Sequence, residues 1–254
     1  MKLEILYKDR DIIVVKKPAF VSSQEERGAG ADMVSCIRNY YAIEEEKQVQ
    51  VFVVHRLDKP VAGVMVYALN KRSAAALSKQ LANGDFNKTY YAILKLLEKT
   101  PGVLGFNEKK VLTDYLIKDG RSNMSRIAEK GEIKDAKKAV LEYEITDKKD
   151  IDGRMLYLAK ICLITGRHHQ IRVQFSGNGA PLYGDKKYGS LAPTKKSCKK
   201  TDTDIIQDSS SNNDENEGIA LCAYALRFNH PVTGKTMEFS ITPDNSIFGR
   251  FFNE

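Results

Sequence analysis

Short apolar stretches separated by turn residues recur along most of the chain. They are rich in Val, Ile, Leu and Tyr and are bounded by Pro, Gly or charged residues, which predicts β-strands. The N-terminal stretch predicts a strand and not a signal peptide, because it contains acidic residues and no small-residue cleavage site. The other predicted strands cover residues 12–18, 51–54, 63–69, 89–97, 137–145, 156–164 and 169–176, and residues 229–241 predict a hairpin that turns at Thr233 and Gly234.

Two stretches instead repeat their apolar residues at helical spacing. Residues 31–42 predict a helix that Asp32 caps, and residues 70–84 predict a second helix that Asn70 caps and an Asn-Gly pair ends. The apolar faces are Val34, Ile37 and Tyr41 in the first helix and Ala74, Leu77 and Leu81 in the second. Both stretches therefore have the face and the start signal that an amphipathic helix requires.

The order of these elements indicates the fold class. Strands outnumber helices and follow one another in runs, which favours an α+β fold with a mixed, mostly antiparallel central sheet, flanking helices and an active-site cleft. We expect residues 1–254 to form one domain. Residues 192–218 have almost no apolar side chains and are rich in Ser, Asn, Asp and Lys, so we expect a disordered insertion there.

Composition and charge narrow the class of protein. The chain is 42% hydrophobic and 29% charged, and no apolar run approaches the roughly 18 residues that a membrane span needs. The net charge is +7, and the predicted insertion has four lysines against six acids, so the remainder carries +9. A basic body suits a polyanionic partner, with nucleic acid first, or simply a solvated lysine-rich surface. Charge alone does not decide between the two.

Metal and redox motifs are not evident in the sequence. The four cysteines lack C-x-x-C spacing, which indicates a reduced, cytoplasmic setting. His168 and His169 are adjacent, and in the predicted strand at 169–176 such neighbours would point to opposite faces. We therefore expect that the two imidazoles do not bind one ion.

The stretch VVHRLDKPVAGV, residues 53–64, places charged groups directly after an apolar run. Arg56 and Asp58 are two residues apart, and in an extended segment residues i and i+2 face the same side. By itself an Arg-x-Asp pattern indicates no more than a turn aspartate that caps the next element.

The wider context changes that interpretation. The segment HRLDKPVAGVMVYALNKRSAAALSKQL resembles the H-R-L-D motif of the RluA-type RNA pseudouridine synthases. The other stretches that resemble this family, in the same order, are IIVVKKPAFV, NKTYYAIL, TGRHHQIRVQFSGNGAPLYGDKKYG and LRFNHPVTGKTMEF. The resemblance covers roughly residues 3–243 apart from the insertion, and several elements in order are far more specific than one short motif.

The resemblance implies a fold and a reaction. It implies a pseudouridine synthase catalytic domain without the N-terminal RNA-binding domain that many relatives carry. The implied reaction isomerises uridine in RNA to pseudouridine by base flipping, with no cofactor and no metal. The chain departs from the family at Val61 and Ala62, where Thr and Ser are usual, which could loosen the loop that presents Asp58. It also departs at Leu221–Cys222, where a histidine is usual.

The resemblance also assigns chemical roles. Asp58 matches the catalytic aspartate, which serves as a nucleophile or base at the sugar. Arg172 pairs with Asp58, and we expect its guanidinium to keep that carboxylate ionised in a pocket without water. Tyr90 stacks on uracil and moves a proton at C5. Ile171 packs against the base. Taken from the residues alone, Tyr90 and Ile171 would be core residues and Arg172 an exposed strand residue.

A second group of residues is implied in RNA binding. Arg56 matches the arginine of the H-R-L-D motif and would fill the gap that the flipped uridine leaves, while His55 is placed beside it as a substrate-binding residue. The expected phosphate contacts are Lys88, Arg167, Lys186 and Lys187. Each of these four is equally consistent with a plain solvated side chain.

Three functions remain open from the sequence. The first is an RNA pseudouridine synthase acting on rRNA or tRNA, the second a non-catalytic RNA-binding protein, and the third a base-flipping hydrolase such as a glycosylase. We expect a cytoplasmic monomer that binds RNA, needs no obligatory protein partner and does not bind a membrane.

Overall fold

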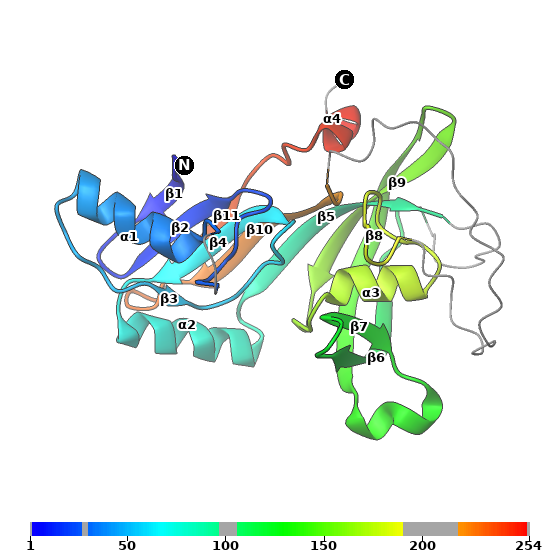
Figure 1. The fold of residues 1–254 in the computed structure, drawn as a ribbon, viewed down its shortest axis with the longest axis horizontal. Coiled ribbons are helices and arrows are strands. Elements are labelled where there is room, and N and C mark those ends of the chain that lie inside the picture. The colour runs from blue at the N-terminus through cyan, green and yellow to red at the C-terminus, as the bar shows by residue number, and fades with distance from the viewer. Residues whose placement is uncertain (1, 27–29, 97–105, 190–217, 253–254) are drawn as a thin grey trace.

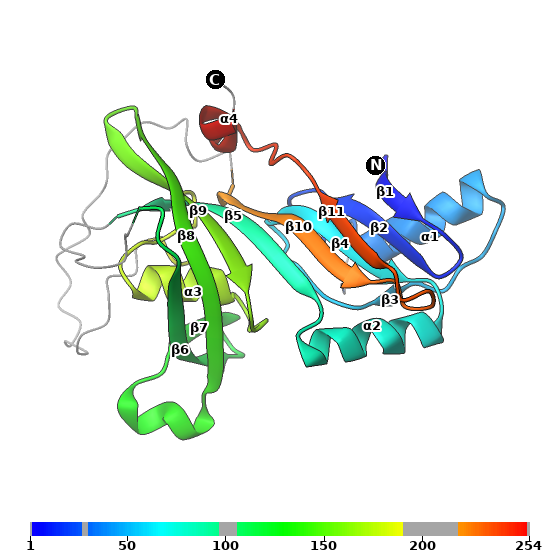
Figure 2. The same cartoon turned by 180° about the vertical axis from the view of Figure 1, so that it is seen from behind.

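A single sheet runs through the molecule (Figures 1 and 2). The computed structural model describes residues 2–26, 30–96, 106–189 and 218–252, and within these ranges the sheet has 11 strands. The strands are β1 (Glu4–Lys8), β2 (Ile12–Lys17), β3 (Phe52–Val53), β4 (Ala62–Ala68), β5 (Asn87–Lys95), β6 (Lys110–Asp119), β7 (Met124–Ile127), β8 (Lys137–Ile151), β9 (Arg154–Leu163), β10 (Leu221–Asn229) and β11 (Thr236–Ser240).

The strand order is β1-β2-β4-β10-β5-β9-β8-β6-β7, with β3 on β4 and β11 on β10. All of these pairs are antiparallel except β4 and β10, which are parallel. The helices are α1 (Met33–Glu44), α2 (Lys71–Asn83), α3 (Gln170–Gly177), α4 (Ser246–Phe252) and the short 3-10 helix η1 (Lys130–Asp135). The expected α+β class with a mixed, mostly antiparallel sheet is therefore confirmed, whereas the single-domain interpretation stays a prediction.

The helices cover both faces of the sheet, and this explains why β2 is apolar at successive positions. Ile13 and Val15 of β2 join a cluster that includes residues of α1 and α3. Ile12 and Val14 point to the other face and join residues of α2 and α4. All four side chains are fully buried. A strand that is covered on both faces needs a continuous apolar run and not an alternating one.

Both predicted helices are confirmed. The Asp32 carboxylate accepts the N–H of Ser35 at 2.8 Å at the start of α1, and Asn70 does the same for Ser73 at 2.9 Å at the start of α2. Helix α2 ends at Gly84, which has φ +83°. The predicted hairpin is also present as β10 and β11.

The strand predicted at 169–176 is wrong, because this segment forms α3. Ile171, Val173 and Phe175 alternate with polar residues, which looked like a strand with one buried face. In the structure residues 170–176 are all buried, including the polar ones. Alternation of apolar and polar residues indicates a strand only where one face is exposed to solvent. In this buried segment it did not distinguish a strand from a helix.

Other expectations have different outcomes. The strand at 51–54 is reduced to the two half-buried residues of β3. Strands β6 and β7 and helix α4 were not anticipated. The predicted insertion at 192–218 lies outside the described residues except for Gly218. In the part of the chain that the structure describes, every helix is too short or too polar to cross a membrane.

The parallel contact between β4 and β10 depends on Gly63. Gly63 pairs with Ala223, and a Cβ at position 63 would lie 2.3 Å from the Cβ of Ala223 and 2.6 Å from its carbonyl oxygen. Real atoms do not approach so closely, so only glycine allows the two strands to meet. This junction joins β1, β2 and β4 to the rest of the sheet and lies five residues beyond Asp58.

We expect Gly63→Val to destabilise the protein by about 2–3 kcal/mol, because β4 and β10 must move apart to accept the side chain. Urea unfolding would measure this change. Gly120→Ala is the matched control, since a Cβ at Gly120 meets no atom within 4 Å, and its stability should stay near that of the wild type. Equal stability of the two variants would contradict the proposed role of Gly63.

Candidate active site

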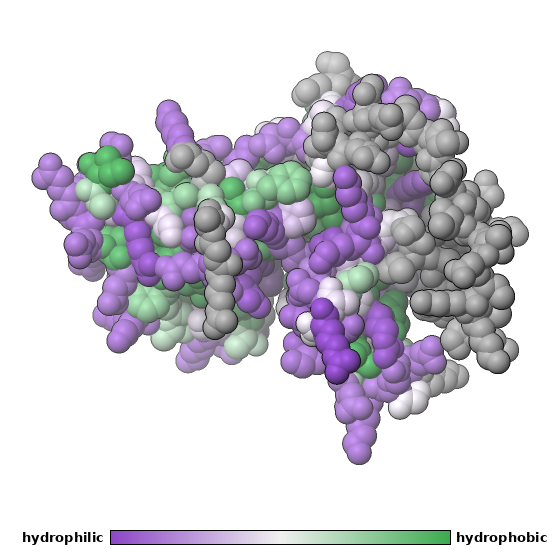
Figure 3. All heavy atoms as spheres, viewed as in Figure 1, coloured by the Kyte–Doolittle hydropathy of each residue, from purple (hydrophilic) through white to green (hydrophobic). Residues whose placement is uncertain are grey.

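A long groove crosses the molecule where its two halves meet. The end of α2 contributes Leu81 and Gly84 to one wall, and β6 and the β6–β7 turn contribute Lys118 and Asn123 to the other. Figure 3 shows an indentation between the half that carries α2 and the half that carries α3 and β7, with mainly hydrophilic residues around it. The groove receives side chains from segments that are more than 100 residues apart in sequence.

The H-R-L-D segment enters the groove with alternating orientation. His55 and Leu57 are buried, Arg56 is exposed, and Asp58 is partly exposed. The Oγ of Ser23 donates to the carbonyl of Leu57 at 2.8 Å and accepts the Leu57 N–H at 3.0 Å, which keeps the backbone extended. The expectation that Arg56 and Asp58 share one side therefore agrees with the burial pattern and with their common position in the groove.

His55 faces the interior, although it was expected to bind substrate. Its Nε2 accepts the backbone N–H of Val66 at 3.2 Å, and its ring packs edge-on against Phe86. Burial lowers the pKa of His55 to about 3, with a smaller contribution from Lys88. The imidazole is therefore neutral and holds the H-R-L-D segment onto β4, so it lies at the groove wall as a structural residue.

Lys17 fixes the turn that follows Asp58. Its ammonium group is fully buried and donates to the carbonyls of Pro18, Val21 and Lys59 at 2.9, 2.7 and 3.1 Å. Burial lowers the pKa of Lys17 to about 8, against the opposing effect of Asp58. One buried cation thus ties the loop after β2 to the turn that presents the aspartate.

Asp58 points away from its own turn and toward α3. Its backbone carbonyl accepts the Val61 N–H at 2.9 Å, whereas its carboxylate Oδ2 accepts from Nη1 of Arg172 at 3.2 Å. The side chain is 27% exposed. Among the described residues nothing donates a hydrogen bond to Oδ1. The carboxylate is therefore not a turn cap, and one of its oxygens is free for chemistry.

Arg172 is itself held by a second carboxylate. Its Nε and Nη2 donate to Asp185 Oδ2 and Oδ1, both at 2.8 Å, in a bidentate ion pair whose acid has no exposed side-chain surface. The guanidinium also lies over the ring of Tyr188, 5.1 Å from its centroid. The two acids outweigh the effect of burial and raise the pKa of Arg172. Arg172 therefore has a fixed orientation and directs one remaining N–H group to Asp58.

The rings of the two adjacent histidines lie against each other, whereas the sequence predicted that they would point to opposite faces of a strand. The rings of His168 and His169 stack with centroids 3.8 Å apart, because they lie in a loop and not in a strand, and His169 has φ +52°. Nδ1 of His169 lies 2.8 Å from the Tyr188 hydroxyl, and its Nε2 lies 3.6 Å from Asp58 Oδ2. Burial lowers the pKa of His169 to about 4, so the imidazole beside Asp58 is neutral.

The hydrogen bonds of Tyr188 select the tautomer of His169. The backbone N–H of Ser125 donates to the Tyr188 hydroxyl at 2.8 Å, so the hydroxyl proton is available to Nδ1 of His169. Nε2 then carries the imidazole proton on the side of Asp58. In this arrangement the N–H of a neutral imidazole, and not a second full positive charge, faces the Asp58 carboxylate.

Gln170 organises the loop that brings this histidine to Asp58. Its Oε1 accepts from the Thr165 hydroxyl at 2.8 Å and from the Arg167 N–H at 2.9 Å, and its Nε2 donates to the Val140 carbonyl at 3.1 Å. The side chain is 3% exposed. A buried amide that makes three hydrogen bonds fixes the loop before α3 and hence the start of the helix that carries Arg172.

Tyr90 and Ile171 line the groove beside Asp58. Both are buried members of the core cluster that lies under α1 and α3. Burial, followed by the nearby charge of Asp58, raises the pKa of Tyr90, so its hydroxyl keeps its proton at neutral pH. Tyr90 and Asp58 thus line the same groove, and the catalytic role expected for Tyr90 stays a prediction.

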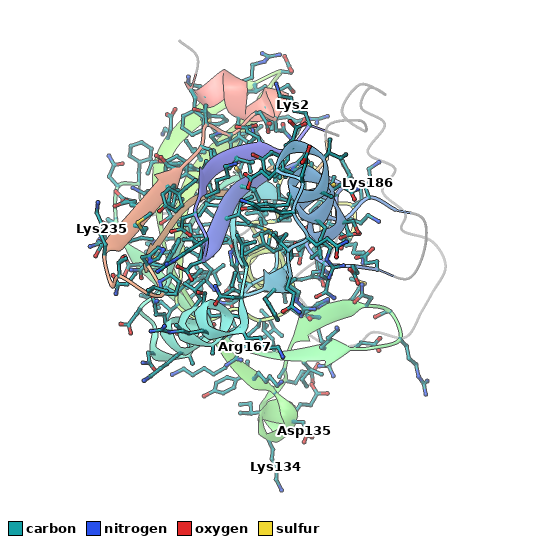
Figure 4. The ribbon with its side chains drawn as sticks, turned by 90° about the vertical axis from the view of Figure 1, so that its left-hand side faces the viewer. Lys2, Lys134, Asp135, Arg167, Lys186 and Lys235 are labelled. Atoms are coloured by element: carbon teal, nitrogen blue, oxygen red, sulfur yellow. The ribbon has the colours of Figure 1, made fainter. Side chains whose placement is uncertain are left out.

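The four basic side chains expected to contact phosphate line the groove. Lys88 is partly buried on the same face of β5 as Tyr90, and burial lowers its pKa. Arg167 is exposed, although its Nε donates to the Lys138 carbonyl at 2.9 Å. Lys186 and Lys187 also line the groove. Figure 4 shows Lys186 on the side of the molecule opposite Lys235.

One cluster of metal-binding residue types occurs among the described residues, but it lies outside the groove. Asp9, Asp11 and His230 place ligand atoms within 4.8 Å of one another. The Asp9 carboxylate already accepts from Nε2 of His230 at 2.8 Å, the Tyr7 hydroxyl and two backbone N–H groups. These contacts join the β1–β2 turn to the β10–β11 hairpin, and they account for the cluster without an ion.

Sequence reasoning missed several residues that hold the site together. They are Lys17, Ser23, His169, Asp185 and Tyr188. All of them except Ser23 stand in stretches that resembled the family: Lys17 in IIVVKKPAFV, and His169, Asp185 and Tyr188 in TGRHHQIRVQFSGNGAPLYGDKKYG. No role followed from the letters alone, since a loop Asp and Tyr have many uses.

Known proteins resemble this chain over nearly its whole length. A family model described as RNA pseudouridylate synthase matches residues 11–177. The tRNA pseudouridine synthase C of Haemophilus ducreyi is 28% identical over 262 residues, covering 99% of this chain and 96% of that protein. The ribosomal large subunit pseudouridine synthase D of Vibrio cholerae is 31% identical over 253 residues, covering 97% and 69%.

Solved structures support the same fold. The human protein called RNA Pseudouridylate Synthase Domain Containing 4 superposes with a TM-score of 0.69 at 19% identity, covering 98% of this chain and 90% of that chain. The human Domain Containing 1 protein gives a TM-score of 0.67 at 20% identity, covering 96% and 84%. At this identity the likeness concerns the fold.

We expect Arg172→Leu to destabilise the protein by about 3–5 kcal/mol, because it leaves the Asp185 carboxylate buried without a cation. Chemical denaturation would measure the loss. The double variant Arg172→Leu/Asp185→Asn should regain much of it, since the amide keeps an acceptor and carries no charge. If the double variant were no more stable than the single one, the buried charge would not be the cause.

We expect stability to fall as the pH is lowered from about 6.5 toward about 4. The folded protein keeps His169 neutral down to its pKa of about 4, whereas the unfolded chain binds a proton near 6.5, so acid favours unfolding in this window. His169→Asn tolerates φ +52° and has an amide at the position of Nδ1, but it does not titrate. Its unfolding free energy, measured against pH, should have a shallower slope than that of the wild type; identical slopes would contradict the assignment.

Proposed function

Because the chain belongs to the RNA pseudouridylate synthase family, whose members isomerise uridine in RNA to pseudouridine, we propose that its groove binds a uridine of tRNA or rRNA and that Asp58 starts the reaction. The observation that carries this proposal is the state of the Asp58 carboxylate. Its Oδ2 accepts a hydrogen bond from Nη1 of Arg172 at 3.2 Å, and its Oδ1 accepts no hydrogen bond from the described residues. A free carboxylate oxygen at a groove floor suits attack on a sugar or removal of a proton from it.

The reaction is an isomerisation, so atoms balance within the substrate. The bond from the sugar C1′ to N1 of uracil breaks, the base turns, and C1′ bonds to C5. The proton on C5 is lost and N1 gains one. Asp58 acts at the sugar as nucleophile or base. The Tyr90 hydroxyl, which its raised pKa keeps protonated, lines the same groove and is suited to exchange a proton with the base.

The groove also suits the flipped state of the substrate. Uridine in folded RNA must leave its stack, which costs a few kcal/mol. Arg56 is exposed beside Asp58, and its planar guanidinium can fill the vacated place. Ile171 forms an apolar surface for the base, and Lys88 and Arg167 are suited to phosphate contacts along the strand.

The choice between tRNA and rRNA comes only from the relatives, which act on one or the other by name. We further propose a cytoplasmic monomer that needs no cofactor and no obligatory protein partner. The two alternative functions differ in product: a glycosylase would release free uracil, and a non-catalytic RNA-binding protein would form neither product. Chromatography of tRNA and rRNA transcripts after incubation with the protein distinguishes all three.

We expect Asp58→Asn to abolish pseudouridine formation and to leave RNA affinity within about two-fold. Phosphate contacts dominate affinity, and this change removes none of them. Single-turnover assays on unmodified transcripts and filter binding to the same RNA would measure the two effects. Lys235→Gln, on the hairpin away from the groove, is the control and should turn over normally. Turnover by Asp58→Asn would remove Asp58 from the mechanism.

A further inference from the structure

Phe20 has an unusual conformation and an unusual exposure for a large apolar residue. Its φ is +64° and its side chain is 59% exposed. The left-handed conformation costs an L-residue roughly 1–2 kcal/mol, and bulky residues adopt it rarely. The other non-glycine residues with positive φ in the described chain are Glu46, Asn107, Asn123, Asp152 and His169, and all of these are polar. An exposed ring buries little surface that could offset this strain, so packing within the protein does not explain why a phenylalanine occupies position 20.

The hydrogen bonds of Lys17 join the loop that carries Phe20 to the turn that follows Asp58. The Lys17 ammonium binds the carbonyls of Pro18 and Val21, which flank the position, and also the carbonyl of Lys59. Lys59 directly follows Asp58 in the chain. The loop that carries Phe20 and the turn that carries Asp58 are therefore fastened to one buried cation, and both residues line the same groove.

One edge of the Phe20 ring lies toward Gly218. A Cβ at Gly218 would lie 2.9 Å from Cζ and 3.4 Å from Cε2 of Phe20, and Gly218 has φ +75°, so a glycine at this position leaves room for the ring. The rest of the ring is exposed in the groove. The site therefore offers an aromatic surface on which a ligand can pack.

We propose that Phe20 is a stacking platform for an unpaired RNA base next to the uridine that enters the pocket. This inference rests on the proposed function. Removal of one base from a stack leaves its neighbours without a partner on one face, and RNA-binding proteins receive such splayed bases on aromatic rings. Stacking of a base on an aromatic ring contributes about 1–3 kcal/mol. Arg56 is exposed and lines the same groove, and its positive charge suits a nucleotide better than an apolar protein segment.

Three substitutions separate stacking from a structural role. Phe20→Gly relieves the left-handed strain and removes the ring, Phe20→Leu keeps an apolar side chain without a π-face, and Phe20→Tyr restores the ring. If Phe20 serves RNA, Phe20→Gly should unfold at the same temperature as the wild type or higher. A fall in the unfolding temperature of several degrees would indicate that the ring packs within the protein.

Binding is measured to unmodified tRNA and rRNA transcripts in the Asp58→Asn background, so the assay does not depend on turnover. We expect Phe20→Gly and Phe20→Leu to weaken binding to the preferred transcript by about 5- to 100-fold, which corresponds to the loss of one stacked base. Phe20→Tyr should bind like the parent. The dependence of affinity on salt should not change, because no phosphate contact is lost. Phe106→Leu is the matched control, since Phe106 is 50% exposed but lies outside the groove, and its binding should be unaltered.

The position of the base is tested with 2-aminopurine placed on either side of the target uridine. Its fluorescence should differ between the parent and Phe20→Leu complexes at one of the two positions. Full affinity of Phe20→Leu, or a loss that Phe20→Tyr does not restore, would overturn the stacking proposal. A wild-type protein that binds RNA without forming pseudouridine would instead overturn the proposed function and leave the result for Phe20 intact.

Discussion

The buried ion pair of Arg172 and Asp185 is the interaction on which the rest of the site depends. A guanidinium that is 5% exposed is stable only if its charge is matched, and Asp185 matches it with two parallel hydrogen bonds. That pair uses Nε and Nη2, so Nη1 remains for Asp58, and it donates to Oδ2 at 3.2 Å. The arginine that contacts the candidate nucleophile is thus held by a residue 127 positions away from Asp58.

The same constraint explains why α3 is a helix that is buried on all sides. Arg172 must reach Asp185 and Asp58 while Ile171 and Phe175 enter the core. In a strand, Arg172 would point away from the face that carries Ile171 and Phe175. In the helix, the core lies on one side and the two carboxylates lie on another, so these three side chains all reach their partners. Lys17 joins the loop after β2, through the carbonyls of Pro18 and Val21, to the turn after Asp58, through the carbonyl of Lys59. The backbone around Asp58 is therefore tied to β2, while its carboxylate is held by Arg172 of α3.

The sequence predicted the elements whose environment is simple. The capping residues Asp32 and Asn70 were read correctly because a cap is a contact within three residues. Strands β2, β4, β5, β8 and β9 were predicted because their apolar runs are bounded by turn residues or charged residues, whereas β6, β7 and most of β10 were not. The segment 169–176 was read wrongly because its polar residues are as buried as its apolar ones. The orientation of His55 was also missed, since nothing local indicates that its Nε2 accepts the Val66 N–H across 11 residues.

The sequence by itself determined the family, the α+β class and the identity of Asp58, Tyr90 and Arg172 as groove residues, because motifs in order and local periodicity are properties of neighbouring residues. Only the tertiary structure decided which partner each charge has. Asp185 orients Arg172, His169 is kept neutral between Asp58 and Tyr188, and Phe20 is exposed in a strained conformation on Gly218. These relations depend on burial and on distances between segments that only the folded sheet brings together. Desolvation sets the cost of every buried charge, and no local pattern in the sequence reports it.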